Sequence, residues 1–325
     1  MRRKLLNVKR IGILALVLAL FIAVGVAEEE RTDASGLWKY VLEDGGATIT
    51  GCVEEPSGEL VIPSELGGYP VTAIGDEAFD CASGFTGVTI PGSVTRIGER
   101  AFSLCAGLTS VTIPGSIKTI GDLAFVGCFR LESVTISEGV TSIGAGAFHE
   151  CFSLPSLTIP ASVTSIGANG KGLSYEYLVS DDYVMAFYDV ASNNPQYEQI
   201  DGVLFDKQEK TLVMYPAGRQ GAYAVPEGVL RIGDGAFFDC WGLTGVTIPD
   251  GVTSIGDWAF TGVVIGCENM TSATIPDSVT SIGQNAFYGC HNVTLSVAEG
   301  SCAEEYAKEN EIPYVFTTEK TGHIG

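Results

Sequence analysis

Residues 88–167 decide the fold, because they repeat one unit of 23 residues. They read VTIPGSVTRIGERAFSLCAGLTS, VTIPGSIKTIGDLAFVGCFRLES, VTISEGVTSIGAGAFHECFSLPS and LTIPASVTSIG. A fixed period of this length is typical of a solenoid, in which each unit is too short to bury its own apolar face and stacks on its neighbours. Each unit has six apolar positions in register, which in the second unit are Leu108, Val111, Ile113, Ile117, Ile120 and Phe125.

One unit is expected to contain a strand, a second extended piece and a short helical turn. Val111 and Ile113 alternate with polar residues, which predicts a strand with one buried face, and Pro114 ends that strand. Residues 117–120 form a shorter extended piece, and Asp122 is placed to cap the helical turn that follows it. The sequence therefore predicts a mainly-β repeat solenoid of parallel strands.

The rest of the chain divides around these repeats. Runs of Gly, Pro and Asn mark most of the boundaries. We expect a signal peptide (1–27), an N-terminal cap (28–61), repeats (62–167), an irregular insertion (168–199), a β-hairpin-like segment (200–216), repeats (217–295), and a C-terminal cap and tail (296–325).

The first 27 residues have the form of a bacterial secretory signal. A basic head is followed by an apolar run over residues 11–26, and small residues precede Glu28, where we expect cleavage. The alternative is a retained membrane anchor, but the run is shorter than the roughly 20 residues that a spanning helix needs. The sequence therefore predicts a secreted or cell-surface protein with no membrane insertion once the signal is removed.

The predicted mature chain is strongly acidic. Residues 1–27 contain five of the 18 Lys and Arg and none of the 39 Asp and Glu, so their removal changes the formal net charge from −21 to −26. Such a charge repels nucleic acid and anionic membrane surfaces, and we expect neither as a partner. Attraction to cationic partners or divalent ions and a merely solvated surface both remain open.

Six cysteines occupy one position of the unit and are expected to form a column. Equivalent Cβ atoms in stacked coils lie about 4.8 Å apart, whereas a disulfide favours about 3.8 Å. We therefore expect buried free thiols that act as small apolar filler, with disulfides as the alternative. The sequence contains no C-x-x-C pair, so the cysteines do not indicate a metal site. The column consists of Cys105, Cys128, Cys151, Cys240, Cys267 and Cys290.

No motif in the sequence points to catalysis. His149 and His291 lie beside column cysteines, but no third group is evident to orient a thiol–imidazole pair. G-x-S-x-G, a phosphate-binding loop and H-E-x-x-H are all missing. We predict no catalytic residue, no metal and no cofactor. Acidic residues also recur after the corner glycine of the unit and form an acidic column. We expect them to cap the turns, with a calcium site as the alternative. The column comprises Asp76, Glu99, Asp122, Asp234 and Asp257.

Two surfaces are candidates for binding. Insertions in solenoids are often placed on the binding face, and exposed tyrosines are favoured contact residues. The predicted ligand-binding residues in the irregular insertion are Tyr175, Tyr177, Tyr183 and Tyr188. The alternative is a diverged coil whose aromatic side chains pack inward. The second surface is a threonine row on the exposed strand face, formed by Thr89, Thr112, Thr135, Thr158, Thr247 and Thr274.

The unit L-x-x-V-x-I-P-x-x-V-x-x-I-G-x-x-A-F-x-x-C resembles the BspA-type leucine-rich repeat of bacterial and protist surface proteins, also called the Treponema pallidum type. The resemblance covers most of residues 60–295 and implies a leucine-rich-repeat stack. It further implies a non-enzymatic adhesion protein whose partner is a protein or glycan on host or neighbouring cell surfaces. A structural or scaffolding role in a cell-envelope assembly is the alternative function.

Overall fold

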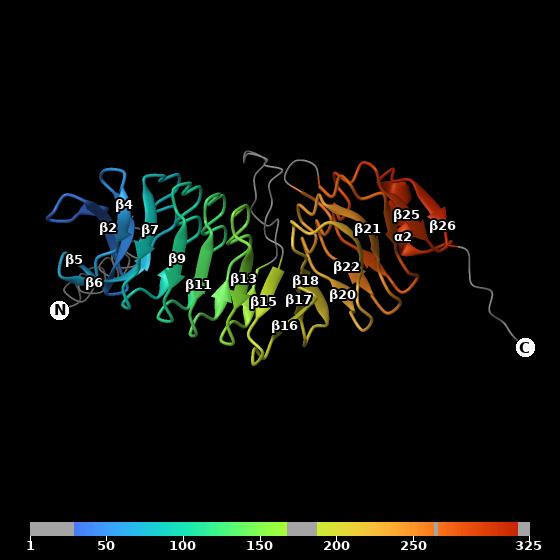
Figure 1. Ribbon diagram of the computed structural model, residues 1–325, viewed down its shortest axis with the longest axis horizontal. Helices are drawn as coiled ribbons and strands as arrows, with labels where there is room; N and C mark the ends of the chain where they lie inside the picture. The colour runs from blue at the N-terminus through green and yellow to red at the C-terminus, as the bar shows by residue number, and fades with distance from the viewer. Residues whose placement is uncertain (1–28, 168–186, 263–265, 318–325) are drawn as a thin grey trace, which may run out of the picture.

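The computed structural model describes residues 29–167, 187–262 and 266–317 of the chain. These residues form an elongated stack of coils, with the first and last coils at opposite ends of the long axis (Figure 1). The predicted signal peptide, residues 1–27, lies outside the described residues. We call residues 29–167 the N-terminal block and residues 215–317 the C-terminal block.

The N-terminal block contains fourteen strands in its described residues. They are β1 (Arg31–Thr32), β2 (Trp38–Glu43), β3 (Gly46–Cys52), β4 (Gly58–Val61), β5 (Glu65–Leu66), β6 (Tyr69–Ile74), β7 (Phe85–Thr89), β8 (Arg96–Ile97), β9 (Ser110–Ile113), β10 (Thr119–Ile120), β11 (Ser133–Ile136), β12 (Ser142–Ile143), β13 (Ser156–Ile159) and β14 (Ser165–Ile166).

The remaining described elements connect and build the C-terminal block. They are β15 (Phe187–Val190), β16 (Tyr197–Ile200), β17 (Val203–Asp206), β18 (Thr211–Met214), β19 (Gly221–Ala224), β20 (Arg231–Ile232), β21 (Leu243–Thr247), β22 (Ser254–Ile255), β23 (Ser272–Thr274), β24 (Ser281–Ile282), β25 (Thr294–Val297), helix α2 (Cys302–Glu309) and β26 (Tyr314–Phe316).

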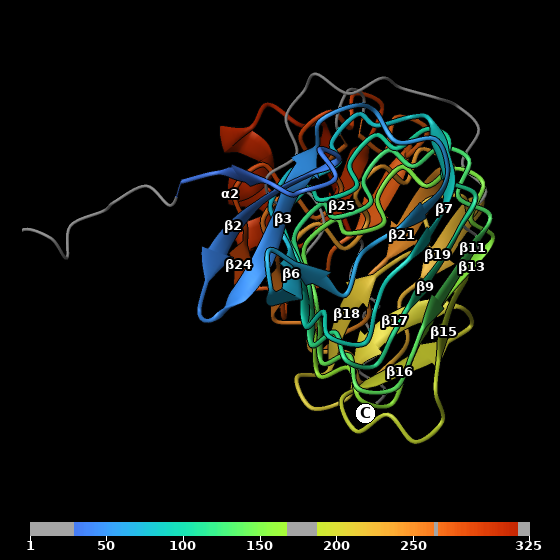
Figure 2. The same cartoon turned by 90° about the vertical axis from the view of Figure 1, so that its left-hand side faces the viewer.

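Each regular coil contributes one longer and one shorter strand to two parallel sheets. The longer strands pair in the order β11-β9-β7-β4, and the shorter ones continue as β6-β8-β10-β12-β14. Paired residues in β9 and β11 are 23 positions apart, as in Val111 with Val134, so the sequence period equals one coil. Seen along the stack, the coils superimpose (Figure 2). The predicted mainly-β solenoid of parallel strands is confirmed.

The core is a set of columns that run along the stack. The phenylalanine of each Ala-Phe turn stacks on its equivalent, with ring centroids 5.2 Å apart for Phe79–Phe102, 5.1 Å for Phe102–Phe125 and 5.3 Å for Phe125–Phe148. Phe102 and Phe125 are fully buried. Stacked aromatic pairs stabilise by roughly 0.5–1.5 kcal/mol beyond the area that they bury. One apolar residue per coil therefore becomes a continuous aromatic ladder.

Each end of the stack carries a different kind of cap. At the N-terminal end β2 and β3 form an antiparallel hairpin, and β3 pairs in parallel with β6. At the C-terminal end helix α2 packs near β24 and β25, and its N-cap residue Ser301 accepts a hydrogen bond from the Glu304 amide. No helix in the described part of the chain is long and apolar enough to cross a membrane.

A hairpin with two apolar faces joins the two blocks. The sequence predicts a hairpin over residues 200–216, and β17 and β18 pair there in antiparallel orientation, after which β18 pairs in parallel with β20. Leu204 and Met214 belong to the core of the N-terminal block, whereas Val203, Phe205 and Leu212 belong to the core of the C-terminal block. Alternation along β17 sends Leu204 into one core and its neighbours Val203 and Phe205 into the other, and a register shift between β17 and β18 accompanies the same division between Leu212 and Met214.

Candidate functional site

The tyrosines predicted to bind a ligand are not assembled into a site by the described residues. Tyr175, Tyr177 and Tyr183 lie outside the described residues. Tyr188 lies in β15, which pairs in parallel with β13, with Tyr188 opposite Leu157. The final part of the predicted irregular insertion therefore contains a strand, β15, that continues the stack by pairing with β13, the last of the longer strands of the N-terminal block.

Residues after β15 are also part of the packed structure. The Asn194 side chain is buried and donates to the carbonyl oxygens of Pro160 and Val163 at 2.7 and 3.0 Å. The buried Tyr197 places its hydroxyl 2.9 Å from the Ile166 amide, which donates to it. These bonds attach residues 190–197 to the last coil of the N-terminal block.

The outward face of the longer strands is a regular, exposed hydroxyl surface. In β9, β11 and β13 the residues that point outward are a serine and a threonine, separated by one inward-pointing residue. The parallel register aligns the side chains of β9 and β11 into two rows, and β13 repeats the pattern in the next coil, where it pairs with β15. All six are exposed: Ser110, Ser133, Ser156, Thr112, Thr135 and Thr158.

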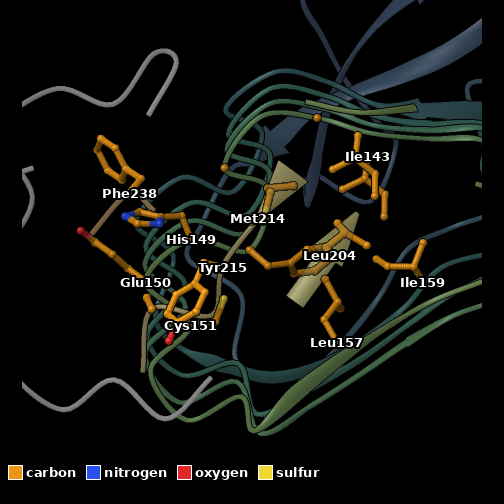
Figure 3. Close-up of a pocket in the computed structure, with 16 residues that line it drawn as sticks. Ile143, His149, Glu150, Cys151, Leu157, Ile159, Leu204, Met214, Tyr215 and Phe238 are labelled. Atoms are coloured by element: carbon orange, nitrogen blue, oxygen red, sulfur yellow. The ribbon is translucent and has the colours of Figure 1, made fainter. Parts of the chain in front are cut away.

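A second candidate site is the seam between the blocks, where turn 147–151 of the N-terminal block faces turn 236–240 of the C-terminal block. A cavity of about 60 Å³ lies here, lined by both turns and by the joining hairpin. His149, Glu150 and Phe238 lie at one end, and Ile143, Leu157 and Ile159 at the other (Figure 3). The volume is less than half of the roughly 150 Å³ of an engineered cavity that admits benzene. The cavity therefore suits a few water molecules, not an organic ligand.

A buried ion pair crosses the seam. His149 Nε2 lies 2.9 Å from Asp239 Oδ2, and the two side chains are only 6% and 13% exposed. The imidazole also meets the Phe238 ring edge to face, at a centroid distance of 5.5 Å. Burial alone lowers the pKa of His149, but the hydrogen bond and the charge of Asp239 outweigh burial, so the pKa of His149 is raised. The pair therefore favours the imidazolium.

Two buried oxygen atoms at the cavity have no hydrogen-bond partner among the described residues. They are Glu150 Oε2 and the Tyr215 hydroxyl, on side chains of residues that are 4% and 2% exposed. Burial raises the pKa of Glu150, and the charge of Asp239 adds to this shift while His149 opposes it. Burial also raises the pKa of Tyr215, against the effect of the nearby Arg219. Both groups therefore favour their neutral forms.

The cysteine column is buried, as the sequence predicts, but its thiols are more than apolar filler. Cys105, Cys128 and Cys151 each donate to the carbonyl oxygen of the phenylalanine in the preceding coil, at 3.2, 3.2 and 3.3 Å. Cys267 and Cys290 make the same bond at 3.3 and 3.1 Å. Burial raises the pKa of the Cys151 thiol. The column therefore links successive coils, and burial keeps the Cys151 thiol protonated.

The acidic column also links coils, and here the expected capping geometry was wrong. Asp122 was expected to cap its own turn, but its Oδ1 accepts from the Ala145 amide of the next coil at 2.8 Å. Asp76 accepts in the same way from Glu99, and Asp234 from Asp257, both at 2.9 Å. Among the described residues no group of three or more His, Cys, Asp and Glu is placed to hold a metal ion.

The histidine and cysteine that adjoin each other in the sequence do not form a catalytic pair. His149 bonds to Asp239, and the Cys151 thiol donates to the Phe125 carbonyl. His291 is exposed on the surface. The described geometry therefore assigns these groups to packing and to the seam.

Sequence reasoning missed the seam residues Glu150, Tyr215 and Asp239. A signal was present in the turns themselves. Turn 147–151 reads AFHEC and turn 236–240 reads AFFDC, whereas the other turns that keep this spacing read AFSLC, AFVGC and AFYGC. Charged residues at these positions indicate that the two turns do not pack against ordinary repeat coils on both sides.

Comparison with known proteins assigns the family. The family described as BspA type leucine-rich repeat region matches residues 69–170 and 222–304 in six copies, which together make up more than half of the chain. The chain belongs to this family. No curated protein matches the sequence.

Solved structures with the same kind of repeat resemble this BspA-type chain. A leucine-rich repeat protein from Eubacterium ventriosum is 26% identical over 84% of this chain and 73% of its own, with a TM-score of 0.53. The pneumococcal vaccine antigen PcpA is 17% identical over 90% and 99%, with a TM-score of 0.54. A leucine-rich cell surface protein from Faecalibacterium prausnitzii is 28% identical over 86% and 97%, with a TM-score of 0.42.

Proposed function

We propose that this protein is a secreted or cell-surface binding protein without catalytic activity, which uses its repeat stack for adhesion or protein–protein contact. The observation that carries the proposal is the outward face of β9, β11 and β13. It repeats exposed hydroxyl side chains over successive coils, in register between β9 and β11, and its inward residues hold the core independently. Such a face can change its contacts without loss of the fold.

Family membership and charge support the same function. The chain has BspA-type repeats, and its repeat unit resembles that of bacterial and protist surface proteins. The form of residues 1–27 is that of a secretory signal. The partner that we propose is a protein or glycan on host or neighbouring cell surfaces. The predicted mature net charge of −26 disfavours nucleic acid and anionic membranes as partners.

The absence of catalysis is supported by the environment of the reactive groups. The column thiols are buried and donate to carbonyl oxygens, and burial raises the pKa of Cys240 and Cys267 well above its usual range. A reactive thiol needs an exposed, electropositive environment that lowers its pKa. These cysteines have the opposite environment.

The test is a binding screen of residues 28–325 against immobilised matrix proteins, glycans and whole cells. One variant carries Thr112→Arg and Thr158→Arg on the strand face, where long cationic side chains obstruct a flat contact. Its matched control is Thr141→Arg, because the equivalent position one coil earlier is already Lys118. Loss of saturable binding in the first variant and not in the control supports the strand face as the contact surface.

A second variant tests the predicted tyrosine contacts. It carries Tyr175→Ala, Tyr177→Ala and Tyr183→Ala and leaves residues 187–199 unchanged, because β15, Asn194 and Tyr197 belong to the packed structure. The control is Tyr288→Ala, a tyrosine that is 55% exposed. Lower affinity with unchanged stability in the triple variant alone supports a tyrosine-based site. Full binding by every variant contradicts both surfaces.

The scaffolding alternative is favoured by one feature, the edge of β26, which pairs only with β25 among the described residues. This strand ends the sheet β19-β21-β23-β25-β26, and Val315 and Phe316 are 53% and 49% exposed. An edge strand with apolar residues and no charge is open to pairing with a second copy of the chain. Concentration-dependent size in light scattering, abolished by Val315→Lys, supports the scaffold; a monomer at all concentrations excludes it.

A further inference from the structure

The seam concentrates titratable groups at positions that are uncharged in the other regular turns. His149 and Glu150 occupy the third and fourth positions of their turn, and Asp239 occupies the fourth position of the turn that faces it. In the other turns with the same spacing the equivalent pairs are Ser103-Leu104, Val126-Gly127 and Tyr288-Gly289, whereas the first turn, with Cys81 one residue out of step, has Asp80 at its third position. The charged residues thus occur where the N-terminal block meets the C-terminal block.

The ion pair in the seam differs from the other ion pairs between described residues. It joins residues 90 positions apart, and both of its side chains are buried. In each of the other pairs at least one side chain is more than 40% exposed. A surface pair contributes little to stability, whereas breaking a buried pair leaves an uncompensated charge. The contact between His149 and Asp239 is therefore able to control how firmly the blocks adhere.

Glu150 makes the same contact sensitive to a second proton. It is almost fully buried at the cavity, next to His149 in the chain, and its Oε2 has no hydrogen-bond partner among the described residues. When Glu150 is protonated, the seam contains one imidazolium and one carboxylate. When Glu150 ionises, the seam contains a second buried carboxylate near Asp239.

We propose that His149, Glu150 and Asp239 form a proton-dependent latch, which holds the two blocks together most firmly at mildly acidic pH and loosens as the pH rises. The latch is independent of what the surface binds. Release at the seam would allow the two blocks to change their relative orientation, and with it the shape of the long contact face.

The two titrations act in the same direction. The raised pKa of His149 means that the pair contributes fully below the ordinary value of about 6.5 and that this contribution is lost as the pH rises through the folded pKa. The raised pKa of Glu150 means that its ionisation, above an ordinary value of 4.5, opposes folding.

The other titratable groups at the cavity do not reverse this trend. Among the described residues the groups that act on His149 are Asp239 from the facing turn and Glu150 from its own turn. Cys151 and Tyr215 also line the cavity, and burial raises the pKa of both, so they stay neutral over the range that matters.

The test follows the two blocks separately. Trp38 reports on the N-terminal block, and Trp241 and Trp258 report on the C-terminal block. Urea unfolding of residues 28–325 is followed by fluorescence from pH 5.5 to 8.5 in W38F and in the double variant W241F/W258F. The latch predicts coincident transitions at pH 5.5 and separate transitions at pH 8.5. Coincident transitions at every pH would overturn it.

Matched substitutions separate the latch from general charge repulsion, which also grows with pH in so acidic a chain. His149→Gln removes the charge within the seam, and His291→Gln makes the same change at an exposed position. The expected result is that His149→Gln reduces the pH-dependent separation to the part that Glu150 supplies, and that His291→Gln preserves all of it. Equal pH dependence in both variants would overturn the latch.

Glu150→Gln is expected to increase stability, a result that cannot come from disruption of the packing. Because the amide resembles the protonated acid, this variant should raise the melting temperature at pH 8.5 by about 2 °C or more and leave it nearly unchanged at pH 4, below the ordinary value of 4.5 for a glutamate. A lower melting temperature at pH 8.5 would contradict the proposed role of Glu150.

Discussion

The regular coils and the seam solve the same packing problem in different ways. From Phe79 to Phe148 the aromatic rings stack at 5.1 to 5.3 Å, and no polar atom interrupts the column. At the seam Tyr215 stacks tilted on Phe237 at 5.0 Å, but no ring contact joins Tyr215 to Phe148 among the described residues. A cavity and a buried ion pair occur there instead.

The difference shows what repetition can and cannot supply. Identical units present identical surfaces, so one set of apolar residues and one set of intercoil hydrogen bonds serves every step of the stack. The seam joins repeat turn 147–151 to repeat turn 236–240 and to the hairpin of β17 and β18, whose side chains have different sizes and spacing. Close packing is lost there, and residues specific to that one contact replace it.

The largest effect is expected from breaking the aromatic ladder inside the regular coils. Phe125→Ala should lower the free energy of unfolding by about 4 kcal/mol, because a fully buried ring between two stacked rings leaves a cavity that cannot collapse. Met214→Ala at the cavity wall should cost less, about 2 kcal/mol, because fewer contacts are lost there. Urea denaturation measures both, and an equal loss would contradict the contrast between coil and seam.

The next largest effect is expected from breaking the ion pair of the seam. Asp239→Ala should cost about 3 kcal/mol at pH 6, because it removes the carboxylate that contacts the buried His149 imidazolium. The cost should become smaller as the pH rises through the folded pKa of His149, which is raised above its ordinary value, because the imidazole then loses its charge. Thermal unfolding at pH 6 and at successively higher pH measures the difference. A cost that is independent of pH would show that the pair acts only through packing.

A smaller effect is expected from the acidic column that links coils. Asp122→Ala should cost about 1 kcal/mol, because the Ala145 amide loses its acceptor. Glu132→Ala, at an exposed position on the longer-strand side, should change stability by less than about 0.5 kcal/mol. Urea denaturation measures the free energy of unfolding of both variants. Equal losses would show that the acidic column does not stabilise the stack.

The smallest effect, and one of opposite sign, is expected at the two buried tyrosines. Tyr215→Phe removes a hydroxyl that has no hydrogen-bond partner among the described residues and should raise stability by up to about 1 kcal/mol. Tyr197→Phe removes the acceptor of the Ile166 amide and should lower stability by about 1 kcal/mol. Thermal unfolding measures the stability change in each variant. A gain for Tyr215→Phe and a loss for Tyr197→Phe would support the difference between the two hydroxyl groups, and a loss in both would contradict it.

Much of the fold was readable from the repeat because every coil meets the same environment. The alternation at Val111 and Ile113 gives the buried strand face, and the 23-residue period gives the parallel register. The cysteine column was predicted to be buried for the same reason, although the bonds from its thiols to phenylalanine carbonyls were not foreseen. The tyrosines of residues 175–183 lie outside the described residues, so their role in binding remains a prediction.

The amino-acid sequence by itself determined the solenoid, its period, its inward and outward faces and its membership of the BspA-type family, because these depend on contacts between equivalent positions. Only the tertiary structure decided that the hairpin divides its side chains between two cores, that Asp122 bonds to the next coil, and that His149 meets Asp239. Those contacts join positions that are not equivalent in the repeat or lie in different coils. Their partners follow from how the chain is placed in space, which no local pattern specifies.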